Sequence, residues 1–262
     1  MTDVDEFESF VGIDYSGSKS ATSRSAAIQV YRSSAGRGPR IVRTAAAGRQ
    51  HRNWCRQEVA QWLVRTIRQQ RVIVGIDHGF SFPLSYFRRY RLNSWNAFLE
   101  DFCRHWPTAD EDTTVDSIRK AYAGPPNRMG ESTDYRLTET WTSSAKSVFL
   151  FDVQGSVAKS TFAGLPWLKY IQDEVSDRVH FWPFDGWVPP ADKSVLAEVY
   201  PSLFRRRFAP RDRTIDQQDA FGVSAWLAAC AERGILSRYL QPPLTESEQE
   251  QAALEGWILG VS

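Results

Sequence analysis

Cysteine is scarce in this chain of 262 residues, and its three cysteines, Cys55, Cys103 and Cys230, lie far apart. No Cys-x-x-Cys pair is present, which excludes a zinc knuckle and a disulfide framework and fits a reducing compartment. The chain also lacks an excess of either charge, because its formal net charge is +1. Bulk charge therefore gives no indication of a nucleic-acid partner.

Long apolar runs are missing as well, and none approaches the ~18 residues needed to cross a bilayer. The stretch from Met1 to Glu8 is acidic, which is the reverse of a signal peptide. We therefore expect a cytoplasmic protein with no membrane partner. Lysine is also rare, so arginine dominates the 32 basic residues. Arginine binds phosphate and carboxylate groups through two parallel hydrogen bonds, although genomic base composition would produce the same bias.

The rest of the composition is ordinary. A hydrophobic fraction of 42% and a charged fraction of 24% are typical of a globular domain, and the length allows a sizeable core. Neither an internal repeat nor a low-complexity linker divides the chain. We expect a single domain over residues 1–262, with an insertion at about residues 84–150.

Apolar patterning in the first part of the chain predicts strands at about residues 9–15, 26–31 and 40–44. Their short connections favour an antiparallel meander. A helix should follow at about residues 52–70, where apolar positions fall three and four apart on one face. The run at residues 71–77 is almost wholly apolar, which is typical of a strand buried on both faces. The order is β-β-β-α-β, and we place the fourth strand beside the first.

The insertion should be mostly helical and should form a cap over the edge of the sheet. Beyond it, the sequence predicts strands at about residues 179–183 and 194–201, and helices at about residues 155–175, 216–233 and 245–254. We expect the first of these helices to be interrupted near residues 164–166. The last should begin with a capping box between Thr245 and Glu248, and the apolar tail at residues 256–260 should dock on the body.

Acidic residues stand where several of these elements end or begin. Asp14 and Asp77 each close an apolar strand, and Glu198 lies near the end of a third. Asp216 and Asp219 open a predicted helix, and their spacing places both on one side. Clustered carboxylates repel one another unless a cation is present, so their convergence implies Mg²⁺ or Mn²⁺. Two such ions about 3.5–4 Å apart can support hydrolysis of a phosphodiester bond.

Each acid also has a structural interpretation. The acids at strand ends suit turns, and those of the helix suit an N-cap or a first turn, where the macrodipole favours negative charge. Glu198 can instead pair with Arg205 or Arg206. The pattern as a whole, rather than any one residue, favours a functional site.

The turn that follows Asp14, Ser16-Gly17-Ser18-Lys19, offers backbone N–H groups, hydroxyls and a lysine. Such a turn can cradle a phosphate group, although an ordinary turn has the same composition. Other polar residues are candidate groove residues, with a structural or solvated role as the alternative. The candidate substrate-binding residues are Ser16, Ser18, Lys19, His78, Arg136 and Lys159.

Five blocks of the sequence resemble the DUF429 family, whose members are predicted to be nucleases with an RNase H-like fold. The blocks are Gly12-Ile13-Asp14-Tyr15-Ser16-Gly17, Val74-Gly75-Ile76-Asp77 with Phe82-Pro83, Glu198-Val199-Tyr200-Pro201, Asp216-Gln217-Gln218-Asp219-Ala220-Phe221 and Glu255-Gly256-Trp257-Ile258. They occur in the order of the family and span nearly the whole chain. The resemblance implies a mixed five-stranded sheet of order 3-2-1-4-5, with helices on both sides.

The resemblance also implies roles for the acids. Asp14, Asp77 and Asp219 would be metal ligands, with Asp216 or Glu198 as a fourth. On this basis we expect a nuclease that depends on Mg²⁺ or Mn²⁺ and acts on DNA or RNA, with Asp14, Asp77, Asp219 and Glu198 as catalytic residues. An ATP-dependent phosphotransferase of the actin and sugar-kinase type and a non-catalytic nucleic-acid-binding protein with this fold are the alternatives.

Overall fold

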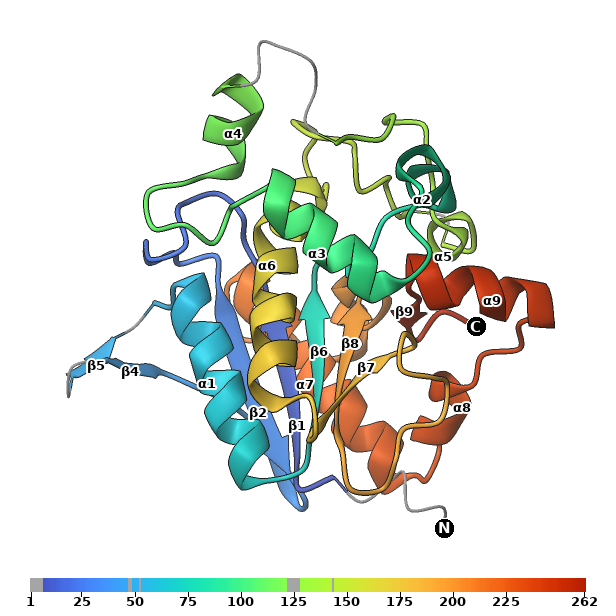
Figure 1. Ribbon diagram of the computed structural model, residues 1–262. Coiled ribbons are helices and arrows are strands. Elements are labelled where there is room, and N and C mark those ends of the chain that lie inside the picture. Colours follow the sequence, from blue (N-terminus) through green and yellow to red (C-terminus); the bar gives the residue numbers. More distant parts are fainter. Residues whose placement is uncertain (1–6, 47–48, 52, 122–127, 143) are drawn as a thin grey trace.

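The computed structural model describes residues 7–46, 49–51, 53–121, 128–142 and 144–262. Figure 1 shows a central sheet with helices on both faces. The strands of this sheet are β1 (Ser9–Asp14), β2 (Gln29–Ser34), β3 (Arg37–Ile41), β6 (Val72–Asp77), β7 (Val179–Trp182), β8 (Ser194–Val199) and β9 (Ile258–Leu259). A separate hairpin is formed by β4 (Thr44–Ala46) and β5 (Arg49–His51).

The order of strands in the sheet is β3-β2-β1-β6-β8-β7, and β9 also pairs with β8. β1, β2 and β3 form the predicted antiparallel meander, whereas β6 lies parallel to β1 and β8 parallel to β6. The mixed α/β sheet and the place of the fourth strand beside the first are therefore confirmed. The described sheet has seven strands rather than five, because β7 and β9 both pair with the outer side of β8. β2 and β3 are separated by fewer residues of the sequence than predicted, because a tight turn at Gly36, with a φ of 67°, joins them.

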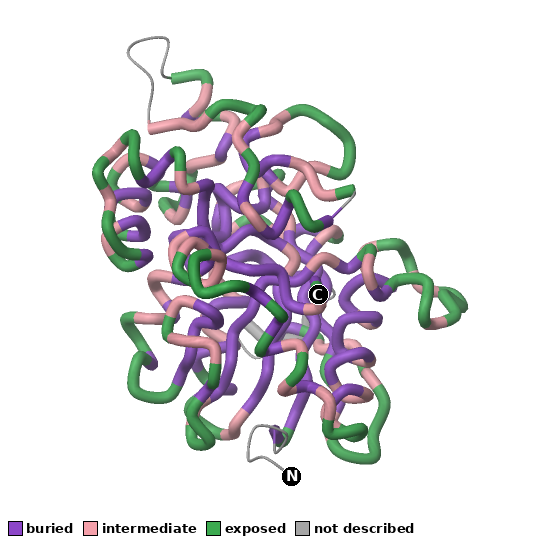
Figure 2. Tube along the Cα trace, turned by 90° about the vertical axis from the view of Figure 1, so that its right-hand side faces the viewer, coloured by how far each residue is buried: buried purple, intermediate pink, exposed green. Residues whose placement is uncertain are grey.

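The helices are α1 (Arg56–Gln69), α2 (Leu84–Tyr90), α3 (Trp95–His105), α4 (Val115–Ala121), α5 (Leu137–Thr140), α6 (Ala158–Val175), α7 (Ile215–Glu232), α8 (Leu236–Leu240) and α9 (Glu246–Glu255). α1 and α6 cover one face of the sheet, and α7 covers the other (Figure 1). Side chains alternate along β6, so that Val72 and Val74 join the core under α1 and α6 while Ile73 joins the core under α7. Figure 2 shows the buried residues concentrated along the central strands and the helices packed on them.

Two strand positions that face α7 are glycines. A Cβ atom on Gly12 would lie 2.1 Å from the carbonyl oxygen of Ala220, and one on Gly75 would lie 2.7 Å from the side chains of Val199 and Val223. Any larger residue at Gly12 would therefore push the helix away. α7 packs directly on the backbone of β1 because of this glycine, close to the point where β1 ends.

The predicted insertion, residues 84–150, contains α2 to α5, and about half of its described residues are helical. Aromatic contacts hold this region together: the ring of Phe82 lies about 5 Å from those of Tyr86, Phe98 and Phe149. Such contacts join residues far apart in the chain, so they do not require helical periodicity.

Two further predictions concern the later helices. α6 is continuous through Pro166, so the predicted interruption near residues 164–166 is wrong. Most of this helix is buried, and that packing outweighs the hydrogen bond that proline removes. α9 does begin with the predicted capping box between Thr245 and Glu248. α1 begins at Arg56 rather than near residue 52, which itself lies outside the described residues. Among the described residues, every helix is too short or too polar to cross a membrane.

Candidate active site

The ends of β1 and β6 place two carboxyl groups side by side. Asp14 closes β1, Asp77 closes β6, and the parallel register pairs the two residues directly. Asp14 is only 9% exposed, and the charge of the neighbouring Asp77 helps to raise the pKa of its carboxyl group. Two neighbouring carboxylates repel each other when both are charged. The pair therefore needs a shared proton or a bound cation.

The first turn of α7 adds two more acids. The hydroxyl of Thr214 accepts a hydrogen bond from the backbone N–H of Gln217 at 3.3 Å and caps the helix. Asp216 is thus inside the helix, and the N-cap role considered for it belongs to Thr214. Asp216 adds negative charge beside Asp14, and the buried Asp219 adds negative charge beside both strand-end acids. We call Asp14, Asp77, Asp216 and Asp219 the aspartate cluster.

The aspartate cluster is short of positive charge. Burial, followed by the charges of Asp77, Asp216 and Asp219, raises the pKa of Asp14 well above its ordinary value. Burial and the charge of Asp219 likewise raise the pKa of Asp77 and, to a smaller extent, that of Asp216. Like charges in a buried site favour proton uptake or cation binding.

Arg205 supplies one positive charge to this cluster. It lies in the 3₁₀ turn Arg205–Arg207, and its Nε and Nη2 atoms each donate a hydrogen bond of 2.5 Å to one oxygen of Asp219. Its charge also opposes the raised pKa of Asp77 and Asp216. The Arg205 side chain is 44% exposed, so solvent weakens its effect. The four carboxyl groups of the cluster therefore have one half-exposed guanidinium as their positive charge.

The donor chemistry of the aspartate cluster suits Mg²⁺ or Mn²⁺, which prefer carboxylate oxygens. No three His, Cys, Asp or Glu side chains in the described part of the chain are already arranged as a ligand group. Arg205 donates hydrogen bonds to both oxygens of Asp219. A cation that uses Asp219 must therefore displace the guanidinium of Arg205 from at least one oxygen.

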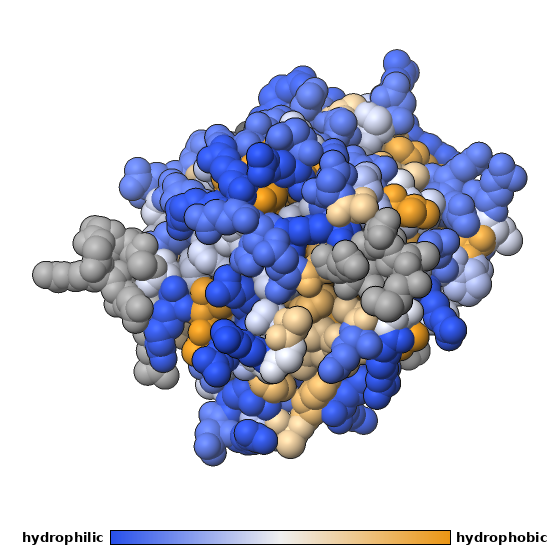
Figure 3. All heavy atoms as spheres, turned by 90° about the horizontal axis from the view of Figure 1, so that it is seen from below, coloured by the Kyte–Doolittle hydropathy of each residue, from blue (hydrophilic) through white to orange (hydrophobic). Residues whose placement is uncertain are grey.

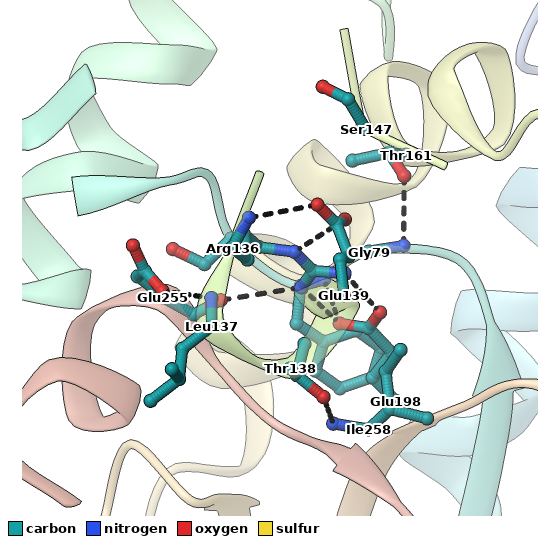
Figure 4. A network of polar contacts seen from close by, with 12 residues as sticks. Gly79, Arg136, Leu137, Thr138, Glu139, Ser147, Thr161, Glu198, Glu255 and Ile258 are labelled. Atoms are coloured by element: carbon teal, nitrogen blue, oxygen red, sulfur yellow. Dashed lines mark hydrogen bonds and ion pairs between the residues drawn. The ribbon is translucent and has the colours of Figure 1, made fainter. Parts of the chain in front are cut away.

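Glu198 belongs to a second group of buried charges, shown in Figure 4. Its two carboxylate oxygens accept hydrogen bonds of 2.6 and 2.7 Å from Arg136. The Nε atom of Arg136 donates to Glu139 at 2.9 Å, and the side chains of Arg136 and Glu139 are each 1% exposed. Nearby, Glu255 accepts hydrogen bonds from the backbone of α2 and α5. We call Arg136, Glu139, Glu198 and Glu255 the Arg136 network.

The contacts of the Arg136 network contradict two of the sequence predictions. Glu198 pairs with Arg136, so its suggested pairing with Arg205 or Arg206 is wrong. Arg136 was predicted to contact substrate, but its guanidinium is buried and held by Glu139 and Glu198. This arrangement leaves Arg136 no surface for a ligand and leaves Glu198 no free carboxylate oxygen.

His78 follows Asp77 but lies in the core, where it is 2% exposed. Its Nδ1 atom donates to the carbonyl oxygen of Gly79 at 2.8 Å, since a carbonyl can only accept. The ring packs 4.7 Å from that of Tyr15. Burial lowers the pKa of His78 to about 4, so the ring is neutral at physiological pH. This geometry favours the structural role for His78 over the predicted contact with substrate.

The turn after Asp14 packs on the first turn of α6. A Cβ atom on Gly17 would lie 1.9 Å from the carbonyl oxygen of Lys159. The hydroxyls of Ser16 and Ser18 lie 3.1 Å apart, and Lys19 donates to the carbonyl oxygen of Arg24 at 2.8 Å. The Nζ atom of Lys159 pairs with Asp116 at 2.8 Å. The hydroxyls thus face each other, whereas both lysines already have partners.

Sequence reasoning missed the role of Arg205, which it considered only as a partner for Glu198. A signal was present in the three consecutive arginines Arg205–Arg207, placed shortly before the acids of α7. It also missed the meaning of Gly12 and Gly75. Each lies two residues before a strand-end acid, a repeated spacing that indicates close approach of a helix.

Comparison of the chain with protein-family models, with curated proteins and with solved structures gives no match. The geometry of the aspartate cluster is therefore the main basis for a functional interpretation.

Proposed function

We propose that this protein is a divalent-metal-dependent nuclease, which hydrolyses phosphodiester bonds of DNA or RNA. The observation that carries the proposal is the pairing of Asp14 with Asp77 at neighbouring strand ends, with the two acids of α7 beside them. Packing does not account for four neighbouring acids of which two, Asp14 and Asp219, are buried, because each additional charge raises the cost of burial. Hydrolysis assisted by Mg²⁺ or Mn²⁺ is a reaction that such a set of oxygen donors supports.

The order of the strands supports an RNase H-like fold for this nuclease. The part β3-β2-β1-β6-β8 follows the order 3-2-1-4-5 that the resemblance to DUF429 implies. In RNase H-like nucleases an acid of the first strand lies beside an acid of the fourth, and a late helix supplies others. In this proposal Asp14, Asp77 and Asp219 take these roles, and β7 and β9 are additions to the RNase H-like core.

In this proposal Asp14, Asp77 and Asp219 hold the cation, and Asp216 is a fourth donor. A bound divalent cation lowers the pKa of water and offsets charge that develops on the phosphate. The charges of Asp77, Asp216 and Asp219 all act on Asp14, so Asp14 is the central donor of this set. Arg205, once displaced from Asp219, is a charged donor at the edge of the cluster and suits a phosphate oxygen.

The test combines cutting with metal binding. Wild-type protein and the variants Asp14→Asn and Asp112→Asn are incubated with labelled single-stranded, duplex and hybrid nucleic acids in Mg²⁺ or Mn²⁺. Wild type and Asp112→Asn, whose changed residue is exposed, should cut, and Asp14→Asn should not. Calorimetry should detect Mn²⁺ binding to wild type that Asp14→Asn weakens. Intact substrates throughout, or equal cutting by Asp14→Asn, would contradict the proposal.

A non-catalytic nucleic-acid-binding protein is the second candidate, and the ion pair between Arg205 and Asp219 favours it. In that case the guanidinium is the permanent counter-ion of Asp219 and no divalent cation binds. Calorimetry separates the two candidates, because the second predicts no heat of Mn²⁺ binding and no cutting while a labelled oligonucleotide still binds.

A further inference from the structure

A cavity of about 400 Å³ lies next to the aspartate cluster. It is formed between the turn Arg205–Arg207 and the start of α7, and Arg205, Arg206 and Arg213 line it. None of the described residues that line it is acidic. Its volume lies in the range of sites that bind small molecules or parts of larger ligands.

Apolar side chains supply much of the remaining wall of this cavity. Phe208, Pro210 and Ile215 are among them. Ile215 is 70% exposed, more than any other exposed large hydrophobic side chain in the described residues. An exposed apolar surface beside arginines suits a ligand that has both a flat apolar face and negative charge.

Other large cavities in the described structure lack this combination. One of about 500 Å³ is lined by Phe7, Phe10, alanines of α7 and the acidic Glu232. At this end the molecule shows a pale-orange, mildly hydrophobic strip within a mainly hydrophilic surface (Figure 3). Another cavity, of about 420 Å³, contains Asp177 and Asp192 beside its arginines. The excess of positive charge is therefore a property of the cavity next to the aspartate cluster.

The arginines of this cavity make it positively charged, and one of them is free to bind an anion. Arg206 is exposed and forms no ion pair with any described residue. Arg213 is held in place, because its guanidinium lies 3.6 Å from the ring centroid of Phe221 and its Nε atom donates to Gln218 at 2.7 Å. Arg205 pairs with Asp219, so it connects the cavity to the aspartate cluster.

α7 presents the cavity and the acids on neighbouring faces of its first turns. Ile215 and Gln218 line the cavity, and each directly precedes an acid of the cluster, Asp216 or Asp219. Consecutive residues of a helix are about 100° apart around its axis. The cavity and the acids are therefore neighbours on the surface of α7.

We propose that this cavity, the arginine pocket lined by Arg205, Arg206, Phe208, Arg213 and Ile215, binds the nucleotide next to the cleaved phosphodiester of a single strand. Its arginines bind the neighbouring phosphate. Its apolar side chains contact the face of the unstacked base, which a duplex would hide. The proposal rests on the proposed nuclease function and names the form of nucleic acid that the site accepts.

The test measures binding without cutting. A fluorescein-labelled thymidine decamer is titrated with protein that carries Asp14→Asn, in buffer with EDTA, and fluorescence anisotropy gives Kd at several salt concentrations. Adding Arg206→Gln should weaken binding about fivefold and lower the salt slope by about 0.7, the value for one lost phosphate contact with a single strand. Adding Ile215→Ser should weaken binding about threefold without changing the slope, because the apolar contact of Ile215 with a base is uncharged.

Arg65→Gln is the matched control, because Arg65 is exposed on α1, on the opposite face of the sheet, and it should leave Kd unchanged. The subsite is overturned if the decamer does not bind, if Arg206→Gln and Arg65→Gln behave alike, or if a duplex or a labelled glutamate decamer binds as well. Wild type that cuts, together with pocket variants that bind normally, would reject the subsite and keep the nuclease. Pocket-dependent binding without any cutting in Mn²⁺ would reject the nuclease and keep the subsite.

Discussion

Two groups of buried charged residues lie close together in this molecule, and they are built differently. In the Arg136 network, Glu198 and Glu139 share a guanidinium, and backbone N–H groups bind the remaining carboxylate oxygens. In the aspartate cluster, the charged neighbours that act on Asp14 are other carboxyl groups, those of Asp77, Asp216 and Asp219. The guanidinium that serves this cluster is half exposed, whereas that of Arg136 is 1% exposed.

This difference separates a structural role from a functional one. A buried carboxylate whose oxygens all accept hydrogen bonds stabilises one arrangement of the chain. A carboxylate that faces other carboxylates gains by binding a proton or a cation. Glu198 was grouped with the aspartates from its place near a strand end, and the structure assigns it to the network that joins β8 to α5. We therefore expect proton or cation binding at the aspartate cluster and not at the Arg136 network.

The largest effect is expected from breaking the Arg136 network. Arg136→Met leaves Glu198 and Glu139 buried without their cation, which should cost about 3–5 kcal/mol of the free energy of unfolding. Arg205→Met makes the same chemical change at the aspartate cluster and should cost about 1 kcal/mol or less, because that pair is half exposed. Urea unfolding of both variants measures the difference. Equal costs would show that the two groups are not distinct.

The second expected effect concerns the contact that brings the acids of α7 to the sheet. Gly12→Ala forces the helix away from β1 and should destabilise the fold by about 1–3 kcal/mol, with weaker Mn²⁺ binding. Gly38→Ala is the control, because a Cβ atom there meets no atom within 4 Å. Thermal unfolding and calorimetry give both values, and unchanged Mn²⁺ binding in folded Gly12→Ala would contradict the positional role of this glycine.

A third prediction sharpens the comparison at Arg205. Replacing it by glutamine frees both oxygens of Asp219, so Mn²⁺ should bind about tenfold more tightly, which corresponds to about 1.4 kcal/mol. Arg207→Gln, in the same exposed turn, should leave Mn²⁺ affinity unchanged. The measurement is calorimetric titration with Mn²⁺ alone. Weaker binding in Arg205→Gln would mean that the guanidinium assists the cation instead of competing with it.

The smallest effect is on the pH dependence of stability. The pKa of Asp14 is higher in the folded chain than in the unfolded chain, so above about pH 4 the folded chain binds more protons. The contribution of the Asp14 carboxyl group to stability is therefore greatest at low pH and is lost as the pH rises. Asp14→Asn removes this loss, and in EDTA at pH 8 we expect it to stabilise the protein by about 1 kcal/mol.

Thermal unfolding of wild type and Asp14→Asn from pH 5 to 8 measures this effect, with Asp112→Asn as the control at an exposed position. Added Mg²⁺ should raise the stability of wild type at pH 8 and should have little effect on Asp14→Asn. A variant less stable than wild type at pH 8 in EDTA would contradict a raised pKa for Asp14.

The sequence predicted the features of this fold that local patterns determine. Apolar runs ending in Asp14 and Asp77 marked the two strand ends, and the spacing of Asp216 and Asp219 placed them on one side of a helix. The pairing of Glu198 with Arg136 could not be predicted, because these residues are 62 positions apart and no periodicity links them. The continuity of α6 through Pro166 depends on burial by distant segments, which local propensity does not contain.

Gly12 has a mechanical consequence for α7. The helix rests on the main chain of β1, so it cannot move closer to the sheet, and any change in its distance from the sheet must be an increase. Movement of α7 away from the sheet separates Asp219 from Asp14, so the acids of the aspartate cluster no longer lie together. A small molecule that inserts beneath the first turns of α7 would therefore act as a spacer, and it would disable the acids without touching any of them.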